Sequence, residues 1–320
     1  MATTTRTPTP QQIRTADRRR HPTSPSRFTS RRRPTPSSSS TLVAALPNTA
    51  RGTSFVTAHS KHGSWIVGVA GGHRAGTIIF DPSTLETYKG SLLQCPHIDP
   101  VLLSLAGEVY ALSRRPRVVP GSDEIDFEPW FHSLSFNREI PIGGGVGHTY
   151  WCELPPPPFF PSLLDPYEFR NPPEISVTAY AALAASSHIL VCGVSAQQAQ
   201  QERPIVLGTY AFHVVTKTWE KVHAENLPFV GQAEPLDDIG GNNLFVACPV
   251  NNGAMAASAS LFHISIKQAS SSCTSMMSAA HPSLSIQEFP VAASEIKVPK
   301  PLFCPLGNGT FCSITLRASR

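Results

Sequence analysis

The sequence predicts an all-β fold in which short antiparallel strands are grouped into repeated four-stranded sheets. Three observations lead to this prediction. The chain of 320 residues contains 31 Pro and 21 Gly, and this content of turn-forming residues favours many short elements over long helices. No segment keeps a helical period of apolar residues over three turns. The third observation, a strand–turn–strand pattern that recurs along the chain, is the strongest.

The recurring pattern is clearest in residues 76–90 (GTIIFDPSTLETYKG) and 208–222 (GTYAFHVVTKTWEKV). Each segment begins with Gly-Thr, continues as an apolar strand that ends in Phe, and passes through a polar turn into a strand with an aromatic residue. The aromatic residue comes eight positions after Phe in the first segment and seven in the second, so we expect one residue of slippage in the turn. Two weaker copies occur, one formed by residues 129–137 followed by residues 149–159 and the other at residues 257–267.

An apolar strand pair precedes each of these segments, at residues 63–72, 102–113, 181–194 and 237–250. Units of ~45 residues, each a four-stranded sheet, are typical of β-propeller blades. Because one such sheet cannot bury both of its faces, blades stack around an axis and ring closure removes free edges. We therefore predict a β-propeller domain over residues 52–320, with about five to six blades. The last blade begins in residues 301–318, and either residues 53–60 supply a strand to close the ring or the ring is incomplete.

Residues 1–51 are predicted to be a disordered tail rich in Arg, Ser, Thr and Pro. They hold ten Arg, no Lys and one acidic residue, a net charge of +9, whereas the remaining 16 basic and 21 acidic residues give the body −5. With few large apolar side chains, the tail cannot offset the entropy of ordering. Three interpretations stay open: a tail without targeting, an organellar transit peptide, or a nuclear-import or weak nucleic-acid patch at Arg18–Arg20 and Arg31–Arg33. Four residues that precede Pro are candidate phosphorylation sites: Thr7, Thr9, Ser24 and Thr35.

The seven Cys are dispersed, odd in number and without a Cys-x-x-Cys pair, which favours reduced thiols and an intracellular location. That location is the cytoplasm or nucleus, or a plastid or mitochondrion if the tail is a transit peptide. The glycosylation sequon at residues 308–310 is then a chance match. No apolar run reaches the ~20 residues needed to span a bilayer, so we expect no membrane association.

Several segments occur in the order found in one plant family of kelch-like proteins, domain of unknown function 1668. Among them are FEPWFHSLSF (127–136), ISVTAYAAL (175–183) and GTYAFHVVTKTWEKVHAENLPFVGQAE (208–234). The sequence resembles this family over roughly residues 60–318, and 208–234 is the most specific part. The resemblance implies a β-propeller-like fold and a plant source, with no established activity. The chain departs from the family in the low-complexity stretch of residues 267–283, in the extra Gly of residues 141–149 and in the missing outer strands of the last blade.

The sharpest candidate for chemistry is the run GHTYWC, from His148 to Cys152. A copper oxidase built on a kelch propeller uses Tyr, Cys, His and an aromatic ring, and this run contains the same residue types. Metal ligation needs convergent side chains, however, and alternate residues of a strand face opposite ways. We interpret the run as the aromatic end of an outer strand and predict no metal.

Other polar and Pro-rich motifs also have simpler structural interpretations. His59 and His62 lie in a Ser/Gly/Lys turn with no carboxylate nearby, which favours a solvated loop over a metal site. Asp237 and Asp238 precede Gly-Gly and are typical of a turn. Pro155–Pro158 could dock an SH3- or WW-like groove, but a rigid spacer between blades is favoured. We predict no cofactor.

One loop is a candidate for partner binding, and the alternative interpretation is a solvated loop of mixed charge. Arg114, Arg115 and Arg117 precede four acidic residues in a long connection between strands, and propeller loops present side chains on a rigid scaffold. We therefore predict a non-enzymatic scaffold that binds a protein partner through its rim. The alternatives are a propeller-based enzyme, either an oxidase or a hydrolase, and a truncated paralogue with little function.

Overall fold

The fold is taken from a computed structural model of the chain. The chain divides into two compact units, Met1–Thr35 and Pro36–Arg320, and every described residue belongs to the second. The described residues are 53–70, 76–95, 97, 99–117, 128–136, 150–161, 172–196, 204–236, 243–250, 259–267, 282–291, 302–307 and 310–314. The predicted tail, its four phosphorylation sites and the sequon asparagine lie outside them.

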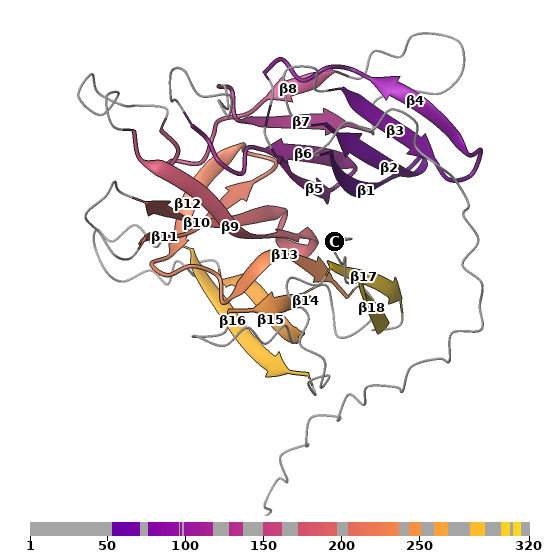
Figure 1. Cartoon of the computed structure of the whole chain (residues 1–320). Coiled ribbons are helices and arrows are strands. Elements are labelled where there is room, and N and C mark those ends of the chain that lie inside the picture. The colour runs from indigo at the N-terminus through magenta and orange to yellow at the C-terminus, as the bar shows by residue number, and fades with distance from the viewer. Residues whose placement is uncertain are drawn as a thin grey trace, which may run out of the picture. The chain divides into compact units, whose positions relative to one another are not determined.

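The prediction of an all-β protein is confirmed in the described residues, which contain β-strands, one 3-10 turn (Ala184–Ser186) and no α-helix (Figure 1). Sheet A contains β1 (Ser54–Ser60), β2 (Gly63–Val69), β3 (Thr77–Asp81) and β4 (Glu86–Gly90). Sheet B contains β5 (Val101–Leu105), β6 (Glu108–Leu112), β7 (Phe131–Ser135) and β8 (Trp151–Glu153). Neighbouring strands in both sheets are antiparallel and consecutive in the sequence, as the repeated unit predicts.

Two further units of four strands join into one curled sheet of eight strands (Figure 1). The first contains β9 (Glu174–Leu183), β10 (His188–Ala196), β11 (Ile205–His213) and β12 (Thr218–His223). The second contains β13 (Phe229–Pro235), β14 (Leu244–Pro249), β15 (Ser260–Lys267) and β16 (Ser283–Pro290). They meet where β13 runs parallel to β9, with Gly231 opposite Ala179. This junction between units was not predicted.

The last two strands, β17 (Leu302–Gly307) and β18 (Thr310–Ile314), form a separate antiparallel pair. The segment proposed to close a ring, residues 53–60, instead provides β1, which pairs with β2 from Ser54 to Ser60. That proposal is wrong within the described strands, because β17–β18 receive no strand from β1. A closed ring of five or six blades is not shown by the described residues.

Equivalent hydrogen bonds confirm the repeat between residues 76–90 and 208–222. The buried Thr77 hydroxyl donates to the Ser91 carbonyl at 2.7 Å, and the buried Thr209 hydroxyl donates to the Glu225 carbonyl at 2.8 Å. In both repeats the side chain therefore anchors the chain that leaves the outer strand. Because these hydroxyls are buried, replacing either one leaves a carbonyl oxygen without its donor.

The turns inside the two repeats have the same length, so the expected slippage is wrong. Asp81 pairs with Glu86, and His213 pairs with Thr218. Each turn ends in a left-handed residue, Leu85 at φ 61° or Lys217 at φ 57°, whose N–H donates to the first residue of the turn at 2.8 Å. The spacing from Phe to the aromatic residue differs by one position because the two aromatic residues pair differently. Trp219 pairs with Phe212 itself, whereas Tyr88 pairs with Ile79, the residue before Phe80.

Aromatic side chains fill the contact between sheet B and the β9–β12 unit. Phe131 and Phe212 are almost fully buried, with ring centroids 5.0 Å apart in an edge-on arrangement. Trp219 lies 5.7 Å from the ring of Phe131 and 5.0 Å from that of Phe212. Burial of each such ring contributes about 2–3 kcal/mol, so this cluster holds the two units in a fixed arrangement.

The proline-rich segment Pro155–Pro158 follows sheet B and packs along the same contact. The carbonyl of Pro155 accepts a hydrogen bond from the Trp219 indole at 2.8 Å. Burial repeats every third residue, with Leu154, Pro157 and Phe160 buried, the period of a polyproline II helix. One side of the segment is therefore occupied within the protein, which agrees with its interpretation as a rigid spacer.

Candidate partner-binding surface

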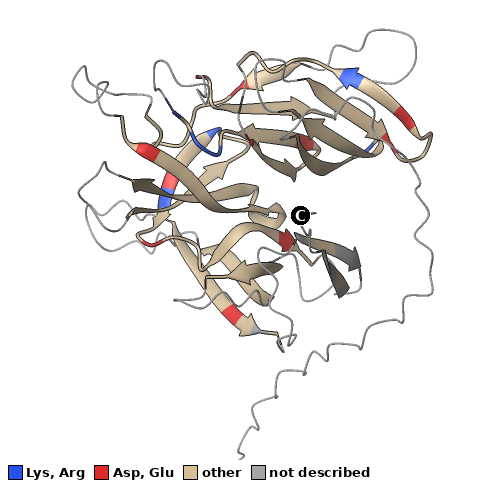
Figure 2. Ribbon diagram, viewed as in Figure 1, with Lys and Arg blue, Asp and Glu red and all other residues tan. Residues whose placement is uncertain are grey.

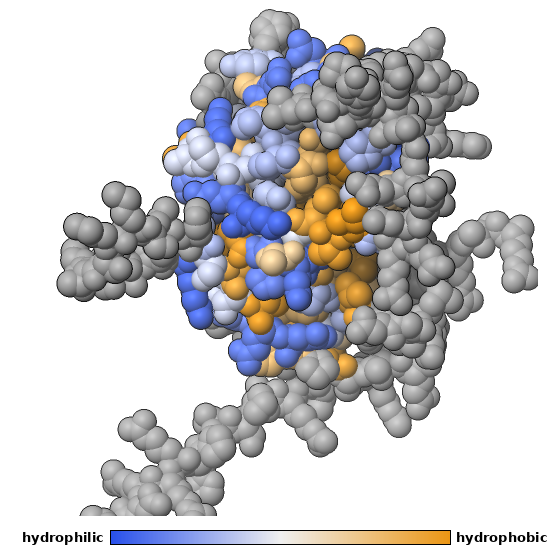
Figure 3. Space-filling view, turned by 90° about the vertical axis from the view of Figure 1, so that its left-hand side faces the viewer, coloured by the Kyte–Doolittle hydropathy of each residue, from blue (hydrophilic) through white to orange (hydrophobic). Residues whose placement is uncertain are grey.

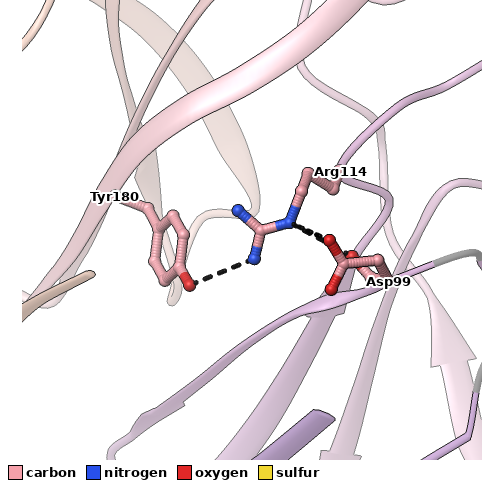
Figure 4. A network of polar contacts seen from close by, with 3 residues as sticks. All are labelled: Asp99, Arg114 and Tyr180. Carbon is pink, nitrogen blue, oxygen red and sulfur yellow. Dashed lines mark hydrogen bonds and ion pairs between the residues drawn. The ribbon is translucent and has the colours of Figure 1, made fainter. Parts of the chain in front are cut away.

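The arginine loop begins where β6 ends, and its first arginine makes contacts inside the protein (Figure 4). Arg114 Nε lies 2.9 Å from Asp99 Oδ2, and its Nη2 donates to the Tyr180 hydroxyl at 3.4 Å. The guanidinium carbon is 5.7 Å from the centroid of the Tyr180 ring, within the range of a cation–π interaction. The Arg114 carbonyl also accepts the Val177 N–H at 2.9 Å. Arg114 thus ties sheet B to β9.

The other two arginines of the loop are placed differently. Arg115 is exposed and Arg117 is half-buried. Among the described residues, Arg115 has no ion-pair partner. Of the four acidic residues that follow in the sequence, only Glu128 is described, and its carbonyl accepts a hydrogen bond from the Cys95 thiol at 2.8 Å. The loop therefore presents Arg115 to solvent from a main chain that Arg114 holds in place.

An apolar strip lies on one face of the β13–β14 pair. Val230 pairs with Cys248, and the Val250 N–H donates to the Pro228 carbonyl at 2.9 Å, so these four residues share a face. Val230 is 42% and Val250 51% exposed, and the other two are half-buried. We call these four residues the β13–β14 strip.

The β13–β14 strip and the arginine loop meet β9 at neighbouring positions. The Arg114 carbonyl bonds to Val177, and Gly231, which follows Val230, pairs with Ala179 two residues further along. With a rise of about 3.3 Å per residue and about 4.8 Å between strands, the main chain of Arg114 lies within about 10 Å of Val230. An apolar surface and a basic loop are therefore adjacent.

Figures 2 and 3 show how charged and apolar residues are distributed over the described part. Figure 2 shows strands that are mostly tan, with charged residues at scattered positions. Figure 3 shows apolar residues open to solvent among hydrophilic ones on one side of the described part. Exposed apolar surface rimmed by polar residues marks interaction sites. The sequence analysis missed the β13–β14 strip; the signal available was the cluster of apolar residues in LPFV and VACPV, which did not reveal which face is exposed.

Two histidines are buried together, His132 in β7 and His97 in the segment before β5. His97 Nε2 lies 3.2 Å from His132 Nδ1, and the rings are 0% and 1% exposed. Burial, with a smaller effect from His97, lowers the pKa of His132 to about 4. His132 is therefore neutral near pH 7, and its Nε2 makes no hydrogen bond within the described residues. No group of three or more His, Cys, Asp or Glu in the described part could hold a metal ion.

The run GHTYWC, which was weighed as a copper site and interpreted as the end of an outer strand, makes contacts of different kinds along its length. Trp151 Nε1 donates to the Thr77 hydroxyl at 2.9 Å, so this indole bonds sheet B to sheet A. Tyr150 is 59% exposed, Cys152 is half-buried, and His148 lies outside the described residues. The described part of the run forms the aromatic end of an outer strand, as the strand interpretation predicts.

The remaining candidates are placed as follows. His59 and His62 are both exposed, but only His62 lies in the turn between β1 and β2. His59, predicted in the same turn, is instead in β1 opposite Ser64, and its Nδ1 is 2.8 Å from the Ser64 hydroxyl. Asp237 and Asp238 lie outside the described residues. No helix in the described part is long and apolar enough to cross a membrane.

Comparison with known proteins gives a family match. The model of a family described as "Protein of unknown function (DUF1668)" matches residues 4–320. No curated protein matches the chain at a significant level.

Proposed function

The chain belongs to the DUF1668 family, and we propose that it is a non-enzymatic recognition module that binds a protein partner. In this proposal the repeated sheets are blades of a kelch-like β-propeller. The plant source, the intracellular location and the use of rim loops for binding belong to the same proposal.

The repeated four-stranded units support the proposal. Four units of four antiparallel strands follow one another in the sequence, and the first strands of the third and fourth units run parallel. Units of this kind present their connecting segments at the ends of the strands, on a scaffold fixed by packing. Such ends are suited to recognition because the scaffold positions side chains before a partner arrives.

The observation that carries the proposal is the apolar strip beside the arginine loop. Protein interfaces typically combine a core of apolar side chains with a polar rim in which Arg is enriched. Val230 and Val250 would supply the first component and Arg115 the second. Arg114 is better assigned to the internal contact, since its guanidinium already meets Asp99 and Tyr180.

The proposal is tested by purification of the tagged full-length chain from its own cells, followed by mass spectrometry. We expect one or more proteins to co-purify in fixed proportion to the chain and to remain bound at physiological salt. Purification of the chain alone, also after mild cross-linking, would contradict the proposal.

A further inference from the structure

We infer that the β13–β14 strip and Arg115 together bind a partner segment in which aliphatic side chains are flanked by acidic residues. This inference rests on the proposed function and specifies its surface and its class of partner. It depends on three features of the described residues: an exposed apolar face, an exposed arginine in the loop whose main chain meets β9 beside that face, and hydrogen bonds that hold both segments.

The apolar face is suited to aliphatic side chains. Val230 and Val250 extend from a strand pair whose opposite face is buried through Phe229 and Pro249, so they cannot turn inward without disrupting the core. Their exposed fractions of 42% and 51% leave surface that a partner would remove from water. Half-buried Pro228 and Cys248 complete an apolar floor between them, on which charged groups would lose hydration without gaining a partner.

The positive charge of Arg115 indicates that the residues flanking the partner's aliphatic side chains should be negatively charged. Arg115 is exposed and has no ion-pair partner in the described part of the chain, whereas Arg114 is held by Asp99. A carboxylate on the partner could therefore form a bidentate pair with Arg115, which the planar guanidinium favours. An acidic flank would also be attracted to the site before contact, because complementary charges raise the association rate.

The support under the strip is fixed by hydrogen bonds. Asn226, just before β13, accepts the Gly208 N–H through Oδ1 at 3.1 Å and donates through Nδ2 to the Gly193 carbonyl at 2.9 Å. The next residue, Leu227, donates its N–H to Cys192 Sγ at 3.4 Å. The chain that enters the strip is thus tied to two other strands. A surface held in this way loses little entropy when it binds.

The inference is tested by selecting a display library of random 12-residue peptides on the immobilised full-length chain. We expect enriched peptides to share two or more aliphatic residues with Asp or Glu beside them. A fluorescein-labelled copy of the most enriched peptide is then titrated against purified variants. We expect Val230→Asp to weaken its binding about tenfold or more, and Arg115→Glu to weaken it about fivefold or more and to reduce its salt dependence.

The matched control is Leu92→Asp, which places the same charge at another apolar residue, 68% exposed. It should bind the peptide as wild type does. Arg115→Lys should keep part of the affinity, and thermal unfolding confirms that each variant is folded. If Val230→Asp does not fold, Val250→Asp, at a more exposed position, takes its place.

Three outcomes would overturn the inference: enriched peptides without the acidic–aliphatic pattern, no enrichment, or binding that survives both Val230→Asp and Arg115→Glu. If Val230→Asp instead converts an oligomer of the chain to a monomer in sedimentation, a second copy occupies the strip and the inference also falls. If a cellular partner binds these variants as well as it binds wild type, the protein is still a recognition module, but it recognises that partner through another surface. The two proposals can therefore fail separately.

Discussion

Acidification should destabilise the protein through the buried His132. The pKa of His132 is lowered from 6.5 to about 4 in the folded protein, first by burial and then by His97. The unfolded chain therefore binds a proton at pH values where the folded protein does not, and stability falls with pH in this range. This loss of folding stability is absent above pH 6.5 and develops as pH falls from about 6.5 to about 4. At about 1.4 kcal/mol per pH unit, the loss is about 3 kcal/mol.

The measurement is the free energy of unfolding in urea between pH 7 and pH 4, for wild type and for His132→Gln. The variant starts less stable, because it loses the contact with His97, but its stability should fall by about 3 kcal/mol less over this range. His62→Gln, at an exposed histidine, is the control and should follow wild type. His188, whose pKa is also lowered by burial and then by His213, remains in all three proteins and cancels in the comparison. Parallel pH curves for wild type and His132→Gln would refute the reasoning.

Three further predictions concern stability and are checked by urea unfolding at pH 7. Arg114→Ala should lower the free energy of unfolding by about 1–2 kcal/mol, because an ion pair and a cation–π contact are lost; a change below about 0.3 kcal/mol would show that this contact does not stabilise the two units. Thr209→Val should lower the free energy of unfolding by about 1–2 kcal/mol, because a buried hydroxyl that donates to a carbonyl is removed. Thr77→Val should cost more, because the Thr77 hydroxyl also accepts the Trp151 indole N–H; an equal or smaller cost would contradict that assignment. Gly208→Ala should destabilise by about 2 kcal/mol or more, as φ is +89° and the new methyl group would lie 2.7 Å from a backbone oxygen. Gly231→Ala is its control, with φ +77° and nothing within 4 Å, and should cost about 1 kcal/mol; equal costs would rule out the steric part of the argument.

Local patterns in the sequence were sufficient to predict many of the strands and the repetition of four-stranded antiparallel units. The Gly-Thr repeats at residues 76–90 and 208–222 each form a strand–turn–strand with the same anchoring hydrogen bond. The turn Ala106–Gly107 was visible as a break between apolar runs, and both of its residues have positive φ, as a two-residue hairpin turn requires. These features could be predicted because alternation of side chains and turn chemistry act over a few residues.

The candidate site was only partly predictable. The arginine loop was identified, but nothing near Arg114 in the sequence indicates that its side chain meets Tyr180, 66 positions away. The β13–β14 strip was missed because Val230 and Phe229 are both apolar neighbours, yet one is 42% and the other 1% exposed. The difference depends on which face of the strand pair the rest of the fold covers.

By itself, then, the sequence determined that this protein is made of four-stranded antiparallel units, because strand pattern and turn geometry are encoded within each unit. Only the tertiary structure decided that β13 adds to β9, that β1 stays in its own sheet, and that one arginine is internal while its neighbour is exposed. These outcomes depend on contacts between residues far apart in the chain, where many pairings satisfy the same local pattern and packing selects one of them.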